Sequence, residues 1–142
     1  MTKIAVLGNG SWGSVLGSML ADNGNDVTLY GNIDSVNEEI NAHHTNSHYM
    51  KDWKLNENTK ATGDLEAALD GAELVLFVLP TKAVRIVAKN VRKVLDKTGA
   101  KPLLVTATKG IEPGSKKLIS EILTEEIYPD DEDKIVAISG PS

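Results

Sequence analysis

Short runs of consecutive apolar residues alternate along the chain with longer segments whose apolar residues recur at helical spacing. The short runs are rich in β-branched residues, and most are continuous rather than alternating with polar residues. This pattern is typical of strands that are buried on both faces of a sheet. It predicts strands over residues 3–7, 26–30, 74–79, 103–107 and 135–138.

Helices are predicted between these strands. A helix over residues 12–23 has one apolar face, and Gly24 stands where it would stop. Ser35, followed by Glu38, has the spacing of a capping box and predicts the start of a short helix. Asp64 is placed to cap a helix over residues 65–70 that Gly71 ends.

Two further helices are predicted to start at Thr81 and Ser115, and Pro129 follows the second. The polar segment 43–62 is predicted to be a long surface loop. Repeated alternation of strand and helix indicates an α/β fold, with a doubly wound parallel sheet, right-handed crossovers and helices on both faces.

Ligands of such sheets bind beyond the carboxyl ends of the strands, where the strand order reverses. The residues that directly follow each strand are therefore the candidates for function. They are residues 8–13, 31–34, 80–82, 108–112 and 140–142.

Composition narrows the class of protein. The 142 residues suit one domain, and the formal net charge of −5 argues against nucleic acid or an anionic membrane as the main partner. The absence of cysteine excludes a disulfide scaffold and a thiolate metal site. No apolar stretch reaches membrane-spanning length and no signal peptide pattern is present, so we expect a cytoplasmic protein.

The chain stops directly after the last predicted strand and a short turn, at Gly140-Pro141-Ser142. It has no closing helix and no polar tail after that strand. We therefore expect it to be a fragment of a longer protein.

The turn Gly8-x-Gly10-x-x-Gly13 follows the first strand and opens a helix, which is the context of a Rossmann dinucleotide-binding turn. Gly8 permits the tight turn, Gly10 lets a pyrophosphate approach the backbone, and Gly13 lets the helix pack on the strand. Gly17, one turn later, keeps the packing face small. The alternative is a glycine turn that only packs tightly.

Ser11 and Trp12 stand at the entry of this helix. Their backbone N–H groups are expected to face the phosphates, because a helix N-terminus offers free donors and the positive end of its dipole. Trp12 could also cover the pyrophosphate, or it could simply pack against the protein.

The tip of the second strand does not choose between NAD and NADP. An acidic residue there would bind the ribose hydroxyls of NAD, and an arginine would favour the 2′-phosphate of NADP. Asn32 is neutral, and Asp34 lies two residues further on. Asp34 either contacts the ribose or belongs to the start of the next helix.

Lys109 directly follows a predicted buried strand at the edge where ligands bind. A dianionic phosphate needs a nearby cation, so this lysine is a candidate ligand for a phosphorylated substrate. The alternative is a solvated lysine beside a turn.

Four segments together resemble the NAD(P)-dependent glycerol-3-phosphate dehydrogenase family, in the family's order and near its spacing. They are Ile-Ala-Val-Leu-Gly-Asn-Gly-Ser-Trp-Gly at 4–13, Val-Leu-Pro-Thr at 78–81, Ala-Thr-Lys-Gly-Ile-Glu at 107–112 and Ile-Ser-Gly-Pro-Ser at 138–142. The resemblance implies a Rossmann-type fold and reversible hydride transfer between sn-glycerol 3-phosphate and dihydroxyacetone phosphate.

The resemblance also implies roles for single residues. The implied cofactor contacts, taken with the glycine turn and the strand ends, are Gly8, Gly10, Ser11, Trp12, Gly13, Asn32, Tyr49, Pro80 and Lys109. Tyr49 matches an aromatic position near the adenosine end, although the Leu-Pro-Gly that usually follows is missing here. The implied substrate contacts are Lys109, Gly140 and Ser142.

The family's motif continues as Gly-Pro-Ser-Phe-Ala, and the chain stops inside it. The resemblance implies a second, α-helical C-terminal domain, which carries the general acid/base lysine and most phosphate ligands. Residues 1–142 would then form the cofactor domain of a two-domain enzyme, with no catalytic residue of its own and little or no activity alone. The parent enzyme is expected to be a homodimer.

Other signals are weaker. His43, His44 and His48 share one segment, but no carboxylate or cysteine completes a metal site, so none is predicted. Asp64 and Glu112 are interpreted as helix-start residues. Two other functions stay open: the Rossmann half of a ketopantoate-type or hydroxyacid-type reductase, and a non-catalytic dinucleotide-binding module.

Overall fold

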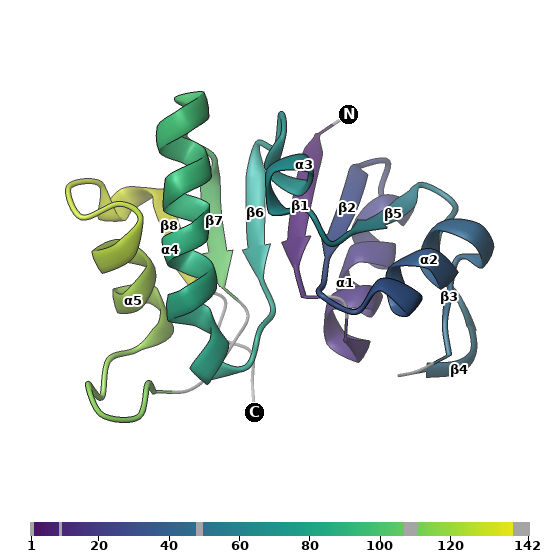
Figure 1. The fold of residues 1–142 in the computed structure, drawn as a ribbon. Helices are drawn as coiled ribbons and strands as arrows, with labels where there is room; N and C mark the ends of the chain where they lie inside the picture. Colours follow the sequence, from purple (N-terminus) through teal and green to yellow (C-terminus); the bar gives the residue numbers. More distant parts are fainter. Residues whose placement is uncertain (1, 9, 48–49, 107–110, 138–142) are drawn as a thin grey trace.

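The computed structural model describes residues 2–8, 10–47, 50–106 and 111–137 of the chain. Among them, six parallel strands form one sheet in the order β5-β2-β1-β6-β7-β8 (Figure 1). The strands are β1 (Lys3–Leu7), β2 (Asp26–Tyr30), β5 (Thr59–Thr62), β6 (Leu74–Phe77), β7 (Leu103–Thr106) and β8 (Ile135–Ala137). The chain moves outward from β1 in one direction and then returns to its other side, so the strand order reverses at β1.

Helices cover both faces of this sheet. One core includes residues of α1 (Ser11–Asp22) and α2 (Asp34–His43). The opposite core includes residues of α3 (Leu65–Leu69), α4 (Thr81–Thr98) and α5 (Ile119–Glu126), and Figure 1 shows α3 and α4 in front of the sheet. The predicted doubly wound α/β class is therefore confirmed.

The central strand shows why its apolar run is continuous. Ala5 and Leu7 enter one core, whereas Ile4 and Val6 enter the other, because successive side chains of a strand point to opposite faces. All four are at most 4% exposed. Burying a side chain as large as valine or leucine contributes about 1.5–3 kcal/mol, so both faces stabilise the fold.

The prediction of an irregular loop over residues 43–62 is wrong. This segment contains the end of α2, a small pair of antiparallel strands, β3 (Thr45–Asn46) and β4 (Met50–Lys54), and the edge strand β5. β5 reads Thr-Lys-Ala-Thr, which is too polar to give a strand signal. Its pairing with β2 and one side chain of α2 stabilise it instead.

That side chain is Asn41. Its amide nitrogen donates to the carbonyl of Ala61 at 2.8 Å, and its amide oxygen accepts the N–H of Ala61 at 2.8 Å. The amide therefore bonds both backbone groups of Ala61 as a neighbouring strand would.

Two predicted helix starts are also wrong. α5 begins at Ile119 rather than Ser115, because residues 111–118 form a turn that an antiparallel bridge between Ile111 and Leu118 closes. α2 begins at Asp34, one residue before the expected cap. The cap at Asp64 is confirmed, since its carboxylate accepts the N–H of Glu66 at 3.0 Å.

The packing of α1 on β2 depends on Gly17. A Cβ at this position would lie 2.6 Å from Cδ2 of Leu29 and 3.3 Å from Cγ1 of Val27, and both side chains are fully buried. Glycine therefore lets the helix approach the sheet closely, as the sequence suggests.

A group of charged side chains joins α4 to α5 and to the turn before α5. Nε and Nη2 of Arg85 each donate to the carboxylate of Glu112 at 2.8 Å, and Nη1 donates to Glu126 at 2.6 Å. The hydroxyl of Ser115 also donates to Glu112, at 2.5 Å. The hydrogen bonds from Arg85, and then the one from Ser115, lower the pKa of Glu112 from 4.5 to about 2.

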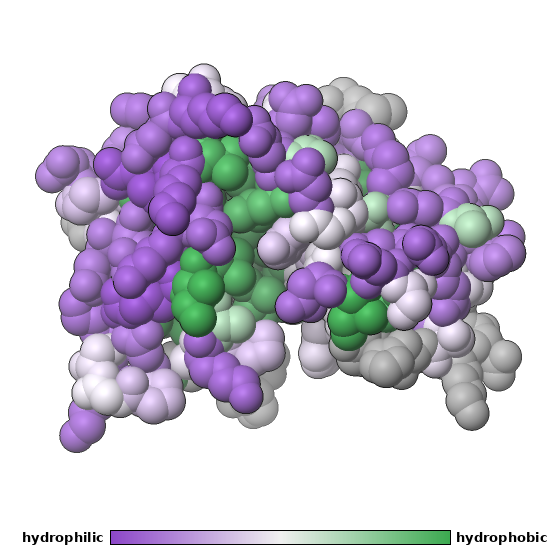
Figure 2. All heavy atoms as spheres, viewed as in Figure 1, coloured by the Kyte–Doolittle hydropathy of each residue, from purple (hydrophilic) through white to green (hydrophobic). Residues whose placement is uncertain are grey.

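The surface seen in Figure 2 is mainly hydrophilic, with apolar side chains visible in the middle of this face beside α4. Within the part of the chain that the structure describes, no helix combines the length and apolar composition needed to cross a bilayer.

The contact at Gly17 predicts a loss of stability in the variant Gly17→Val. Overpacking a dense interface costs about 1–3 kcal/mol, which exceeds the helix propensity of about 0.5 kcal/mol that valine gains over glycine. Urea denaturation should show this loss. The control is Met19→Val, at a residue of the same helix that is 53% exposed, which should change stability by less than about 1 kcal/mol. Equal stability of Gly17→Val and wild type would contradict the packing argument.

The low pKa of Glu112 predicts an acid-dependent contribution to stability. Because this pKa lies below the usual value of 4.5, the ionised carboxylate stabilises the fold above about pH 4.5, and the contribution is lost as the pH falls towards 2. Glu112→Gln should therefore be less stable than wild type near neutral pH, and the difference should shrink on acidification. Denaturation curves measured from about pH 7 to about pH 3 test this. A difference that does not change with pH would contradict it.

Candidate functional site

The carboxyl ends of the parallel strands lie together at the lower edge of the sheet in Figure 1. The glycine turn between β1 and α1 lies at this edge, where the strand order reverses. Backbone hydrogen bonds connect its surroundings: Gly8 donates to the carbonyl of Tyr30 at 2.8 Å, and Val78 donates to that of Leu7 at 2.9 Å. The ends of β2, β1 and β6 are therefore joined around the turn.

Gly8 and Gly13 leave no room for a side chain. Gly8 has a φ of +128°, and a Cβ there would lie 2.1 Å from the carbonyl oxygen of Val78. A Cβ on Gly13 would lie 2.0 Å from the carbonyl oxygen of Gly8. Because the obstructing atoms belong to the backbone, these two glycines are required by the shape of the turn itself.

Gly10 is different. Its φ is −72°, and no described heavy atom lies within 4 Å of the position that its Cβ would take. The fold itself therefore does not require a glycine here. An open space beside a glycine is what the approach of a ligand to the backbone needs.

The open space adjoins the N-terminus of α1. Gly10 is the residue before the helix and has no side chain to cap it, and the first helical bond runs from the N–H of Ser14 to the carbonyl of Gly10 at 2.9 Å. The preceding N–H groups of the first turn have no acceptor within the helix. They carry the positive end of the helix dipole, so the turn can bind an anionic group such as a pyrophosphate.

Trp12 lies in this first turn and is 72% exposed. The side chain of Trp12 is therefore not buried among the described residues. Its indole is free to cover a ligand at the helix N-terminus, and that role stays a prediction.

The turn after β2 is fixed by Asn37, a residue that the sequence analysis missed. The buried amide of Asn37 donates to the carbonyl of Gly31 at 3.0 Å, and the N–H of Gly31 donates to that of Thr62 at 3.1 Å. Asn32 is exposed in this turn, and Asp34 is the exposed first residue of α2. The helix-start interpretation of Asp34 is confirmed, and its contact with a ribose stays a prediction.

Of the remaining candidate residues, the structure describes Pro80 but not the others. Pro80 is exposed after β6, at the start of α4 on the carboxyl edge. Four of the predicted residues lie outside the described residues: Tyr49, Lys109, Gly140 and Ser142. Glu112 is not a helix-start residue as predicted, because α5 begins only at Ile119; its carboxylate pairs with Arg85 instead.

The histidines give no cluster among the described residues. His43 is the exposed last residue of α2, and His44 follows it with a φ of 57°. His48 lies outside the described residues. No three histidine, cysteine or acidic residues gather in the ranges that the structure describes.

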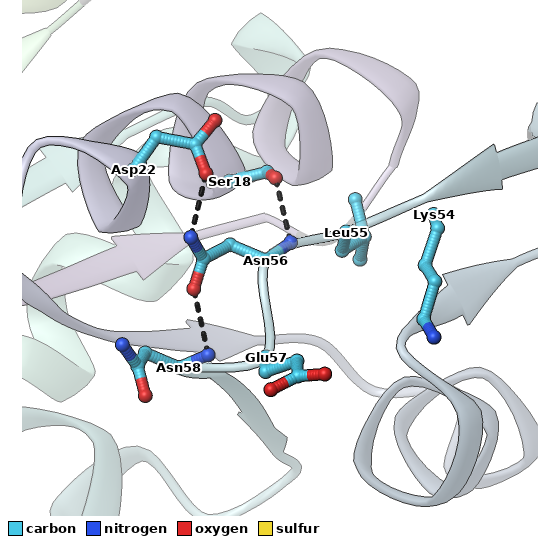
Figure 3. Close-up of a pocket in the computed structure, with 7 residues that line it drawn as sticks. All are labelled: Ser18, Asp22, Lys54, Leu55, Asn56, Glu57 and Asn58. Atoms are coloured by element: carbon cyan, nitrogen blue, oxygen red, sulfur yellow. Dashed lines mark hydrogen bonds between the residues drawn. The ribbon is translucent and has the colours of Figure 1, made fainter.

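A polar groove lies between α1 and the segment before β5 (Figure 3). Its side chains bond one another: Asn56 bonds Ser18 through its N–H at 2.9 Å, and Asp22 through its amide at 2.5 Å. These bonds attach the segment to α1 at the end of the helix remote from the glycine turn. We therefore place the candidate site at the turn and not in this groove.

Comparison with known proteins adds independent evidence. The protein-family profile described as the NAD-dependent glycerol-3-phosphate dehydrogenase N-terminus matches residues 3–142. Two proteins named glycerol-3-phosphate dehydrogenase [NAD(P)+] are similar to the whole chain, one from Lactobacillus helveticus (94% identical) and one from Lactobacillus acidophilus (91% identical). The chain spans 42% of the length of each.

A solved structure supports the same relationship. The crystal structure of glycerol-3-phosphate dehydrogenase from Coxiella burnetii is 33% identical to the chain and superposes with a TM-score of 0.84. The match covers 99% of this chain and 41% of that protein. With the profile match over nearly its full length, the chain therefore belongs to the family of the NAD-dependent glycerol-3-phosphate dehydrogenase N-terminus.

Proposed function

We propose that this chain is the cofactor-binding half of an oxidoreductase that interconverts sn-glycerol 3-phosphate and dihydroxyacetone phosphate with NAD(H) or NADP(H). The observation that carries the proposal is the open space at Gly10, beside the uncapped N-terminus of α1. Family membership and the names of the relatives support the choice of substrate.

The cofactor would bind with its pyrophosphate at the turn that runs from Gly8 to Gly13. N–H groups of Ser11, Trp12 and Gly13 would donate to the phosphate oxygens, and the indole of Trp12 would cover them. The bound nicotinamide supplies the acceptor or donor of the hydride. Asn32, Tyr49, Pro80 and Lys109 would complete the cofactor site. With a neutral Asn32 in the turn after β2, both NAD and NADP remain candidates.

The substrate end would involve Lys109, Gly140 and Ser142. Lys109 follows the end of β7 by three residues in the sequence and would supply the positive charge that a dianionic phosphate requires. The general acid/base would come from a helical C-terminal domain, consistent with relatives that are more than twice as long as this chain. We further propose that the enzyme is a cytoplasmic homodimer that does not bind nucleic acid, in line with its net charge of −5.

Gly10→Ala should weaken cofactor binding without disturbing the fold. A methyl group at Gly10 meets no described atom of the protein, but it would occupy the space proposed for the pyrophosphate. The Kd for NADH, measured by fluorescence titration of the full-length protein, should rise at least about tenfold, while the Tm stays within about 2 °C.

Gly13→Ala is the matched variant at the same turn. Its methyl group would collide with the carbonyl of Gly8, so it should lower both the Tm and the affinity for NADH. If Gly10→Ala bound NADH as tightly as wild type, the pyrophosphate would not lie against this glycine.

Lys109→Met should remove the cation proposed for the phosphate of the substrate. In the full-length protein, kcat/KM for glycerol 3-phosphate should fall by at least about 10²-fold, because a charge-assisted contact to the reacting complex is lost. Wild type should be assayed in parallel with ketopantoate and small hydroxyacids. An unchanged kcat/KM would remove Lys109 from the site, and turnover of an unphosphorylated acid in preference to glycerol 3-phosphate would overturn the substrate assignment.

A further inference from the structure

Glu112 is bonded through all of its polar groups. Its carboxylate accepts two hydrogen bonds from Arg85 and one from Ser115. Its N–H donates to the carbonyl of Lys117, and its own carbonyl accepts the N–H of Lys116, both at 2.9 Å. The position of Glu112 relative to α4 is therefore fixed by side chain and backbone together.

Arg85 is the centre of this arrangement. It lies one turn after the start of α4, and α4 itself begins at the carboxyl edge of the sheet, directly after Pro80. Besides the two bonds to Glu112, it donates to Glu126 at 2.6 Å and approaches Glu125 at 3.4 Å. The side chains of Arg85 and Glu112 are only 22% and 17% exposed, so solvent screens the pair less than a surface ion pair.

The docking of α4 on α5 does not by itself account for a two-pronged contact to Glu112. Buried apolar side chains of both helices already lie in one core, among them Val84, Val91 and Ile122. Arg92 bridges the same two helices further along α4, where it donates to the carbonyl of Ile127 at 2.9 Å. The two parallel hydrogen bonds from the guanidinium of Arg85 also fix the position and orientation of the Glu112 carboxylate relative to α4, and Glu112 belongs to the segment after β7.

That segment contains the proposed substrate lysine. Only two residues stand between Lys109 and Glu112, and three residues of chain span at most about 10 Å. We propose that Arg85, through Glu112, is a positioning residue that sets the place of Lys109 for a phosphorylated substrate. The inference rests on the proposed function, and it assigns to a pair outside the cofactor site a share in substrate turnover.

The test uses the full-length enzyme and the variants Arg85→Met and Glu112→Gln. Each should lower kcat/KM for glycerol 3-phosphate by about 10- to 100-fold, because small displacements of a positioned group cost activity on this scale. The Kd for NADH should rise by less than about threefold, much less than kcat/KM falls, because the glycine turn that would bind the pyrophosphate is untouched and Lys109 is only one of the implied cofactor contacts. The kcat/KM of the double variant should be no lower than that of the less active single variant, because both substitutions break the same contact.

Arg92→Met is the matched control. It removes an arginine that also joins α4 to α5 and pairs with Asp96 at 2.9 Å, but it lies two turns further from the carboxyl edge. It should lower the Tm and leave kcat/KM within about twofold of wild type. The role would then be positional at Arg85 and structural at Arg92.

Three results would overturn the inference while the proposed function stood. They are an unchanged kcat/KM in Glu112→Gln, equal losses of kcat/KM in Arg85→Met and Arg92→Met, and losses that multiply in the double variant. If Arg85→Met fails to fold, Glu112→Gln decides, because it keeps the size of the side chain. Failure of the wild-type enzyme to oxidise glycerol 3-phosphate would instead refute the proposed function. The kcat/KM assay shows this with the wild-type enzyme, before any variant is measured.

Discussion

The fold and its candidate site depend on the close approach of three stretches of backbone at the centre of the sheet. Gly8 lies against the carbonyl of Val78, and Gly13 lies against the carbonyl of Gly8, with no room for a methyl group at either contact. These contacts bring the end of β6 and the start of α1 together over the end of β1. The N-terminus of α1 is thereby directed at the point where the strand order reverses, which is where ligands of such sheets bind.

The three glycines of this turn are glycines for two different physical reasons. Gly8 and Gly13 are required by the protein, whereas the space beside Gly10 is open. A turn that only packed tightly would need Gly8 and Gly13 and could carry a larger residue in place of Gly10. This difference favours a ligand-binding turn, and it can be seen only when the surroundings of each glycine are compared.

Much of the fold could be predicted from the sequence because five of the six parallel strands are short, mainly apolar runs between segments of helical pattern. Lys3–Leu7 and Asp26–Tyr30 were predicted at their observed bounds for this reason. β5 could not be found, because its residues are mostly polar and long-range bonds to β2 and Asn41 stabilise it. The start of α5 was misplaced since Ser115 uses its hydroxyl on Glu112 rather than on a helix N-terminus. The glycine turn was predictable from spacing alone. The bond of Asn37 to the carbonyl of Gly31 carries no motif, and Arg85 acts on Glu112, which only folding brings near.

Asn41 of α2 bonds the outer side of the edge strand β5. A strand at the margin of a sheet exposes a row of backbone donors and acceptors, and another chain can add to it and start aggregation. In β5, the amide of Asn41 occupies the N–H and the carbonyl of Ala61, in the interior of the four-residue strand. These two backbone groups of the edge strand are therefore not available for pairing with another chain. The same two bonds also help to keep a strand of little apolar character in place at the edge of the sheet.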